Sequence, residues 1–141
     1  MPKKSTSNLE NELKRSESLD SFLKENSEEL AVDSLPEQIQ ELLDAKGLTK
    51  ADVVKESNIN EIYAYQILSG ARRPSRDKLL CICFAMKATL DETQSLLQRS
   101  NYAPLYARNH RDSIIMFALS HDKTIFELNG DLYDYGEPLV E

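Results

Sequence analysis

The fold is decided by residues 42–80, LLDAKGLTKADVVKESNINEIYAYQILSGARRPSRDKLL, because residues that start and end helices recur there at short intervals. Gly47 and Gly70 can adopt the left-handed backbone conformation that ends a helix. Pro74 disfavours helix at the residue before it. The stretch is therefore predicted to form several short helices, each too small to bury a core by itself.

Two helices are predicted on either side of Gly47. The first runs from Pro36 to Lys46 and carries apolar residues on one side. The second is about two turns long and begins after Thr49, whose hydroxyl can bond reciprocally with Asp52 in a capping box.

A four-residue turn over 57–60 is predicted to separate the second helix from a third. Ile59 is an inward-facing residue in this turn, and Asn60 is the expected N-cap of a helix over 61–68. A further helix is predicted to start at Ser75, after the loop that Gly70 opens. Helix, short helix, turn, helix, loop and helix is the order of a helix-turn-helix unit, in which two helices brace one that enters the major groove of DNA.

The residues of this region resemble those of the phage-repressor-like helix-turn-helix family, also called the XRE family. The matching segments are KGLTKADVVKESNIN for the bracing helix and turn, IYAYQILSG for the recognition helix, and RRPSRDKLLCICFAMKATLDE for the closing helices. The resemblance covers roughly residues 35–100. It implies binding of a double-stranded DNA operator.

The same resemblance implies DNA-contacting roles for individual positions. Those expected at base edges are Glu61, Ile62, Tyr63, Tyr65 and Gln66. Those expected at phosphates are Lys50, Asn60, Arg72, Arg73 and Arg76. Ile59, Ala64 and Ile67 are expected to hold the recognition helix on the core.

The chemistry of these side chains limits which bases they can read. Gln66 can form two hydrogen bonds with adenine, a contact that distinguishes adenine from the other bases by about 1–3 kcal/mol. Glu61 can only accept from a cytosine amino group, and Ile62 can only contact a thymine methyl group. Tyr63 and Tyr65 have a second interpretation, in which they pack against other helices or against a partner protein.

Charge is unevenly distributed along the 141 residues, whose formal net charge is −7 and whose pI is about 4.9. Residues 1–35 carry five basic and eight acidic groups, residues 36–111 eleven and nine, and residues 112–141 one and seven, for net charges of −3, +2 and −6. The densest basic cluster is Arg72, Arg73, Arg76 and Lys78. It lies beside the predicted recognition helix, where phosphates would be, although a solvated charged surface is the alternative interpretation.

Cys81 and Cys83 are the only two cysteines. Because they lie two residues apart on a helix, their side chains diverge by roughly 200° and cannot form a strain-free disulfide. A reducing, cytoplasmic location is therefore expected. A metal site would require His110 or His121 to approach both thiols, and buried structural cysteines are the favoured interpretation, so neither a metal nor a cofactor is expected.

No enzymatic activity is expected from this sequence. It contains no glycine-rich phosphate loop, no metal-ligand set and no arrangement of Ser, His and Asp typical of catalysis. Arg111-Asp112 and His121-Asp122 are interpreted as charges at helix ends. No membrane association is expected either, since no apolar run could span a bilayer and the polar start lacks a secretory signal.

Residues 1–33 are predicted to form a polar extension that contains an amphipathic helix. Their composition is typical of disorder, but their apolar residues have helical spacing. These residues are Leu9, Leu13, Leu19, Phe22, Leu23 and Leu30. Ser16 to Ser18 could interrupt the pattern and start a second helix, and the helical part could dock on the core or on a second subunit.

Beyond residue 100 the chain is predicted to remain helical. The capping boxes expected in the second half of the chain are Thr89 with Glu92, Asn109 with Asp112, and Thr124 with Glu127. Three side chains of the loop at 101–109 are expected to enter the core, namely Tyr102, Leu105 and Tyr106. Asn129-Gly130 could form a hairpin turn, but apolar spacings of 3, 4 and 3 residues favour a helix there.

The sequence thus predicts an all-α protein: a repressor-like helix-turn-helix bundle of five short helices, with an N-terminal amphipathic helix and two additional C-terminal helices. The predicted domains are the extension at 1–33, the DNA-binding domain at 34–100 and a C-terminal extension at 101–141 that packs on the core. This extension is interpreted either as offering an apolar face for dimerisation or as only completing the core of the monomer. The predicted function is a sequence-specific DNA-binding transcriptional regulator of bacterial or phage type, acting as a homodimer. The alternative is a protein-interaction module with weak or no DNA binding, in which Ile62, Tyr63 and Tyr65 anchor a partner protein.

Overall fold

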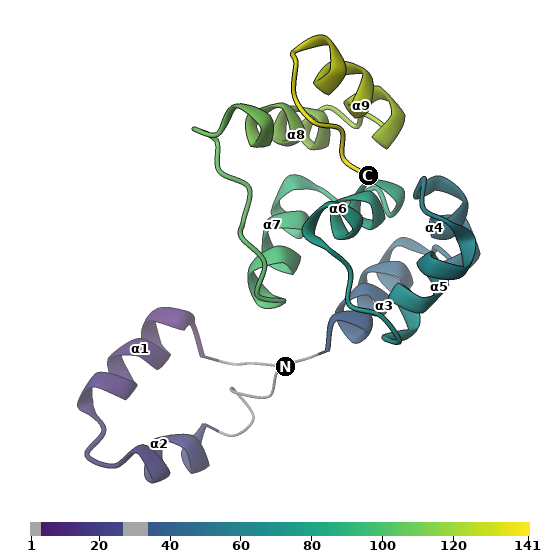
Figure 1. The fold of residues 1–141 in the computed structure, drawn as a ribbon. Coiled ribbons are helices and arrows are strands. Elements are labelled where there is room, and N and C mark those ends of the chain that lie inside the picture. Colours follow the sequence, from purple (N-terminus) through teal and green to yellow (C-terminus); the bar gives the residue numbers. More distant parts are fainter. Residues whose placement is uncertain (1–3, 27–33) are drawn as a thin grey trace. The chain divides into compact units, whose positions relative to one another are not determined.

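A computed structural model describes residues 4–26 and 34–141 of the chain. The regular elements within these ranges are all helices, with no strands, so the prediction of an all-α protein is confirmed (Figure 1). The described residues belong to two compact units that divide between Asp33 and Ser34. No helix in the described ranges is both long enough and apolar enough to cross a membrane.

Within residues 4–26, the N-terminal unit contains two helices where a single amphipathic helix was the main prediction. They are α1 (Thr6–Arg15) and α2 (Leu19–Glu25). The interruption lies at residues 16–18, as the sequence indicated, because Ser18 accepts a hydrogen bond from the backbone nitrogen of Ser21 and so caps α2.

Little apolar surface is buried within this unit. Phe22 is the one buried apolar side chain among its described residues. Three leucines of the predicted apolar pattern are exposed, namely Leu13, Leu19 and Leu23. Leu30, which belongs to the same pattern, lies outside the described residues.

The second unit contains seven helices within residues 34–141. They are α3 (Leu35–Lys46), α4 (Lys50–Glu56), α5 (Glu61–Ser69), α6 (Arg76–Ala85), α7 (Leu90–Arg99), α8 (His110–Ser120) and α9 (Ile125–Asp134). In Figure 1, α6 and α7 lie between the group α3–α5 and the pair formed by α8 and α9. The predicted bounds are correct to within one residue for the first three of these helices, and Ser75 is the N-cap of α6.

Local capping explains most of these boundaries. Three predicted capping boxes are present with both of their hydrogen bonds: Thr49 with Asp52, Thr89 with Glu92, and Thr124 with Glu127. Gly70 ends α5 with a φ of +88°, and a Cβ atom there would lie 2.9 Å from Cγ of Pro36. Gly70 is therefore required both by its backbone conformation and by the close approach of α3.

Two expectations for the C-terminal half have different outcomes. Asn129 and Gly130 lie inside α9, so the helix prediction is confirmed and the hairpin alternative is wrong. Leu105 is buried and Tyr102 is half-buried, but Tyr106 is 60% exposed. The prediction that Tyr106 enters the core is wrong because only its backbone nitrogen is directed inward, as a donor to Asp112.

The core of the second unit is centred on α6. Every residue from Leu79 to Met86 is buried, so this helix has no solvent-facing side after its first turn. It packs against α4, α7 and α9. Cys81 and Cys83 lie in this buried stretch and are free thiols, as predicted.

Burial of α6 leads to a test with two chemically identical deletions. Ile82 is fully buried, whereas Ile62 on α5 is 70% exposed. We expect Ile82→Ala to lower the free energy of unfolding by about 2–5 kcal/mol through lost burial and a cavity, and Ile62→Ala to change it by less than about 0.5 kcal/mol. Urea denaturation followed by circular dichroism measures both values. Equal losses in the two variants would contradict the central position of α6.

Candidate functional site

The turn between α4 and α5 is fixed by contacts within the chain. Ser57 is buried, and its Oγ donates to the carbonyl oxygen of Val54 (2.9 Å) and accepts from the nitrogen of Ile59 (3.2 Å). Asn58 adopts a left-handed conformation with a φ of +59°, which Asn tolerates better than most residues. Ile59 is only 9% exposed. The turn therefore holds α5 at a set angle to α4.

The next feature is the division of α5 into a buried and an exposed side. Ala64, Ile67 and Leu68 are buried against the core. Ile62 is 70% exposed and Gln66 is partly exposed, and because they lie four residues apart they share the side of the helix opposite these buried residues. We call these two residues the α5 stripe.

Two tyrosines flank the α5 stripe on opposite sides. At 100° per residue, Tyr65 lies about 60° from Ile62 on one side, and Tyr63 lies about 60° beyond Gln66 on the other. Tyr65 is 39% exposed, whereas Tyr63 packs partly against the core. The two tyrosines therefore have different surroundings, although the sequence assigned them one role.

On the Tyr65 side the surface is hollowed into a shallow depression of about 440 Å³. It is lined by Lys50, Glu61, Ile62, Tyr65, Gln66 and Ser69. Five of the ten residues that the sequence analysis singled out for DNA contacts thus share one surface. The depression combines an apolar floor with a cation at the start of α4.

On the other side, two cations lie over the ring of Tyr63. The guanidinium carbon of Arg72 is 5.7 Å from the ring centroid, and Nζ of Lys78 is 5.9 Å from it. The backbone nitrogen of Arg72 also donates to the carbonyl oxygen of Gln66 (3.2 Å), which ties the loop to α5. The sequence indicates that Lys78 belongs to the basic cluster but gives it no contact role, because its proximity to Tyr63 is a tertiary contact.

Arg73 belongs to the scaffold of the loop between α5 and α6. Its Nη2 donates to the carbonyl oxygen of Ser100 (2.5 Å), and its guanidinium carbon lies 4.4 Å from the ring centroid of Tyr102. The hydroxyl of Tyr102 in turn donates to the carbonyl oxygen of Pro74 (2.5 Å). These contacts hold the loop in place, and the guanidinium of Arg73 is engaged in them.

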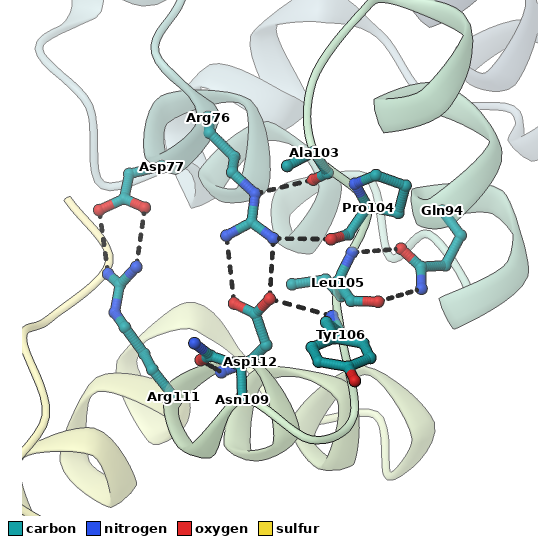
Figure 2. Close-up of polar contacts among 10 residues, drawn as sticks. All are labelled: Arg76, Asp77, Gln94, Ala103, Pro104, Leu105, Tyr106, Asn109, Arg111 and Asp112. Atoms are coloured by element: carbon teal, nitrogen blue, oxygen red, sulfur yellow. Dashed lines mark hydrogen bonds and ion pairs between the residues drawn. The ribbon is translucent and has the colours of Figure 1, made fainter.

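Four of the five N–H groups of the Arg76 guanidinium donate to groups of the same chain, as Figure 2 shows. Its guanidinium donates two hydrogen bonds to the carboxylate of Asp112 (3.1 and 3.0 Å) and one each to the carbonyl oxygens of Ala103 (2.9 Å) and Pro104 (3.1 Å). A guanidinium with these partners has little capacity left for a phosphate.

A second ion pair joins α6 and α8 with the charges reversed, because here α6 supplies the aspartate and α8 the arginine. Arg111 donates two hydrogen bonds to the carboxylate of Asp77 (3.1 and 3.0 Å). Each of the two Arg-Asp dipeptides therefore supplies the arginine of one ion pair and the aspartate of the other (Figure 2). Arg111 also donates to the carbonyl oxygens of Pro138 and Leu139, which holds the C-terminal segment. We call these four charged side chains the Arg-Asp exchange. Its sequence signal was the repeated Arg-Asp dipeptide at 76–77 and 111–112.

Asp112 does not complete the capping box predicted with Asn109. The side chain of Asn109 does accept a hydrogen bond from the nitrogen of Asp112 (2.9 Å), but the carboxylate turns to Arg76 and to the nitrogen of Tyr106 (3.0 Å). Burial tends to raise the pKa of this carboxyl, yet the hydrogen bonds from Arg76 and Tyr106 outweigh it, so its pKa lies below the ordinary value. The prediction failed because a cation distant in the sequence competes for the carboxylate.

The remaining polar groups fit scaffold roles. The side-chain oxygen of Asn60 accepts from the nitrogen of Tyr63 (3.2 Å) and caps α5 as predicted. Burial raises the pKa of the Cys81 thiol to about 11 and that of the Cys83 thiol to about 12, so both stay protonated at neutral pH. Among the described residues, no group of three or more His, Cys, Asp or Glu side chains could hold a metal ion.

Comparisons of the chain with protein-family models, with curated proteins and with solved structures find no match. A function for this chain is therefore inferred from the α5 surface and its surroundings.

The ion pair between Arg76 and Asp112 gives a prediction that depends on pH. Asp112→Asn should lower the free energy of unfolding by about 2–4 kcal/mol at pH 7, because it leaves a largely buried guanidinium without its counter-charge. A carboxyl whose pKa is lowered by folding contributes its full stabilisation above the unfolded pKa, about 3.9, and loses it as the pH falls through the lower folded pKa. The difference between the two proteins should thus be constant from pH 7 to 5 and shrink below about pH 4.

Urea denaturation at a series of pH values measures this difference. Asp134→Asn is the matched control, since Asp134 is exposed and has no ion-pair partner among the described residues. A loss of stability in Asp112→Asn that stayed the same down to pH 3 would argue against the ionised pair.

Proposed function

We propose that the chain is a sequence-specific DNA-binding transcriptional regulator of the repressor-like helix-turn-helix type. In this proposal α4 braces the unit and α5 is the recognition helix. The observation that carries it is the α5 stripe, in which Ile62 is exposed and Gln66 is partly exposed, on a helix whose other side is buried and with cations on both flanks. Lys50 lies on the Tyr65 flank, and Arg72 and Lys78 lie on the Tyr63 flank.

Such an arrangement suits the major groove of B-form DNA. The groove is about 12 Å wide and admits one α-helix, with a phosphate backbone along each side. Cations on both flanks of a helix can contact the two backbones, while side chains on the central stripe reach base edges. Gln66 would then pair with adenine, and Ile62 would contact a thymine methyl group.

The distribution of charge is consistent with a small electrostatic contribution. The chain as a whole has a formal net charge of −7, and the cations beside α5 are few by comparison. Each phosphate neutralised contributes about −0.9 to the slope of log K against log salt. We therefore expect a shallow salt dependence and a correspondingly larger contribution from base contacts and shape.

Binding as a homodimer is part of this proposal. A dimer of such units reads two half-sites about 10 base pairs apart. The helices α8 and α9 and the residue after α9 carry four exposed aromatic residues that could support self-association, namely Phe117, Phe126, Tyr133 and Tyr135, and Phe117 and Tyr135 line one depression. Light scattering at micromolar concentration tests this part, and a single monomeric species would remove it.

The main test is the selection of bound sequences from a random duplex library. The selected duplex is then titrated by fluorescence anisotropy at several salt concentrations. An enriched palindromic motif with a negative salt slope is the expected result. Absence of enrichment at low salt would overturn the proposed function.

Gln66 provides a sharper prediction within the same experiment. Gln66→Ala should weaken binding of the selected duplex by about 1–3 kcal/mol and relax the preference at one base pair, because it removes a two-bond contact with a base. Lys50→Gln is the matched comparison, and it should weaken binding to selected and random duplexes alike. Anisotropy titrations of both variants on both duplexes measure the difference, and equal effects would remove these assigned roles.

One observation favours a second candidate function, a protein-interaction module on the same scaffold. Ile62 is 70% exposed and Tyr65 is 39% exposed, and both line the depression with Glu61. An apolar floor with an aromatic side chain is typical of the central anchor of a protein interface. The library selection separates the two functions, since an interaction module yields no enriched motif.

A further inference from the structure

A partly enclosed pocket lies where α4, α6 and α8 end, among residues that have no part in the proposed DNA contacts. Its volume is about 230 Å³. The apolar part of its lining comes from the end of α6 and from the connection between α8 and α9, and consists of Phe84, Ala85, Ala88, Leu119 and Ile125. The charged part consists of Glu56, Lys87, Asp122 and Lys123. We call this space the α6-end pocket.

Two alanines leave space in the floor of the α6-end pocket. Ala85 is the last residue of α6, Ala88 follows it by three positions, and both are buried. All five apolar lining residues belong to the core, so the floor is continuous with the interior. A cavity of about 150 Å³ with apolar walls holds one benzene molecule. The α6-end pocket therefore has room for one aromatic ring and a short chain attached to it.

The charges at the rim are mainly acidic once the ion pairs are taken into account. Nζ of Lys123 pairs with Asp131 and lies 5.5 Å from the ring centroid of Phe117, and neither of these two partners lines the pocket. Glu56 and Asp122 are exposed and have no ion-pair partner among the described residues. Lys87 thus remains as one cation beside two carboxylates.

The helix ends at the rim also favour a cation. Asp122 follows the C-terminal end of α8 with a φ of +54°, and Glu56 is the last residue of α4. The C-terminal end of a helix carries a partial negative charge, so a carboxylate there is disfavoured and a bound cation is favoured. The N-terminal end of α9 would favour an anion, but the capping box of Thr124 with Glu127 already occupies it.

We propose that the α6-end pocket binds a small primary amine, in which a short chain joins the ammonium to one apolar group about as large as an aromatic ring. The apolar group lies on the floor against Phe84 and Leu119. The ammonium lies at the rim, where Glu56 and Asp122 accept its hydrogen bonds. Burial of the apolar group supplies most of the affinity, and the two carboxylates select for positive charge. This site does not rest on the proposed function.

The first test uses 2-phenylethylamine, which is protonated at pH 7. It is titrated into the full chain at constant ionic strength, while the backbone amide signals of Ala85, Ala88 and Ile125 are followed by NMR. We expect a saturable shift of these signals. Absence of a saturable shift would overturn the proposal.

Two analogues with the same ring test the preference for positive charge. 2-Phenylethanol lacks the charge and should bind roughly tenfold more weakly than the amine, and phenylacetate should bind more weakly still. An alcohol or a carboxylate that bound as tightly as the amine would show a hollow without charge selection and would overturn the proposal.

Glu56→Gln and Asp122→Asn test the source of this preference. Each should weaken binding of the amine about threefold, and the double variant about tenfold. The affinity for 2-phenylethanol should stay the same in these variants, a result that a merely structural role of the carboxylates would not give. Asp134→Asn removes an exposed charge outside the pocket and should bind the amine like the original chain. Unchanged amine affinity in the double variant, or equal losses for amine and alcohol, would contradict the assigned roles.

Ala85→Leu tests the location of the site. The larger side chain fills the floor, so binding of both the amine and the alcohol should be lost, while circular dichroism and urea denaturation verify the fold. Retained binding in the folded variant would overturn the proposal. If this variant does not fold, the charge variants still decide, because Glu56 and Asp122 lie outside the core.

The titrations need no DNA and are therefore independent of the library selection. If the amine binds as expected but no DNA motif is selected, the regulator is overturned and the amine site stands. If a motif is selected but the amine does not bind, the reverse holds.

Discussion

The structure of the second unit depends on the burial of α6 on all sides. From Leu79 to Met86 no side chain of this helix faces solvent, so other helices must surround it. α4, α7 and α9 supply these contacts. Burial of this kind is the main source of stability in a small helical unit, because short helices are marginal by themselves. The positions of the other elements follow from the need to cover α6.

Only the first turn of α6 carries charged side chains, and these three residues point to three different neighbours. Arg76 is bonded to the loop at 103–104 and to α8, Asp77 is bonded to Arg111, and Lys78 reaches the ring on α5. Successive residues of a helix are rotated by 100°, so three in a row span about 200° of its circumference and can reach different neighbours. The start of α6 therefore connects α5 to the C-terminal helices, and the candidate surface is held by the same element that forms the core.

Local features of the fold, such as capping boxes, could be predicted from the sequence, whereas the ion-pair partners of charged side chains could not. The box of Thr49 with Asp52 forms because both partners lie within one turn and no third group competes. Asp112 has the same local opportunity, but Arg76, 36 residues away in the chain, takes its carboxylate. A capping box contributes about 1 kcal/mol, which is less than a largely buried charge would lose without its partner. Tertiary electrostatics therefore override local capping at this position.

The candidate site follows the same rule. The exposure of Ile62 and the burial of Ala64 and Ile67 could be read from helical spacing alone. The three arginines of the basic cluster could not be told apart, because their roles depend on residues from Ser100 to Asp112 that lie far along the chain. Two of them serve the scaffold, and Arg72 remains beside α5 with Lys78. Sequence spacing thus located the surface, and tertiary contacts decided which cations belong to it.

The Arg-Asp exchange has a consequence for the accuracy of assembly. Its two dipeptides neutralise each other only when Arg76 meets Asp112 and Asp77 meets Arg111. A shift of α8 by one residue in one direction would place Arg111 against Arg76, and a shift in the other would place Asp112 against Asp77. Either error replaces two attractions with a repulsion between poorly hydrated like charges. The two ion pairs thus favour one register of α8 relative to α6. We expect insertions or deletions between the two dipeptides to be tolerated only in loops that can change length without shifting α8.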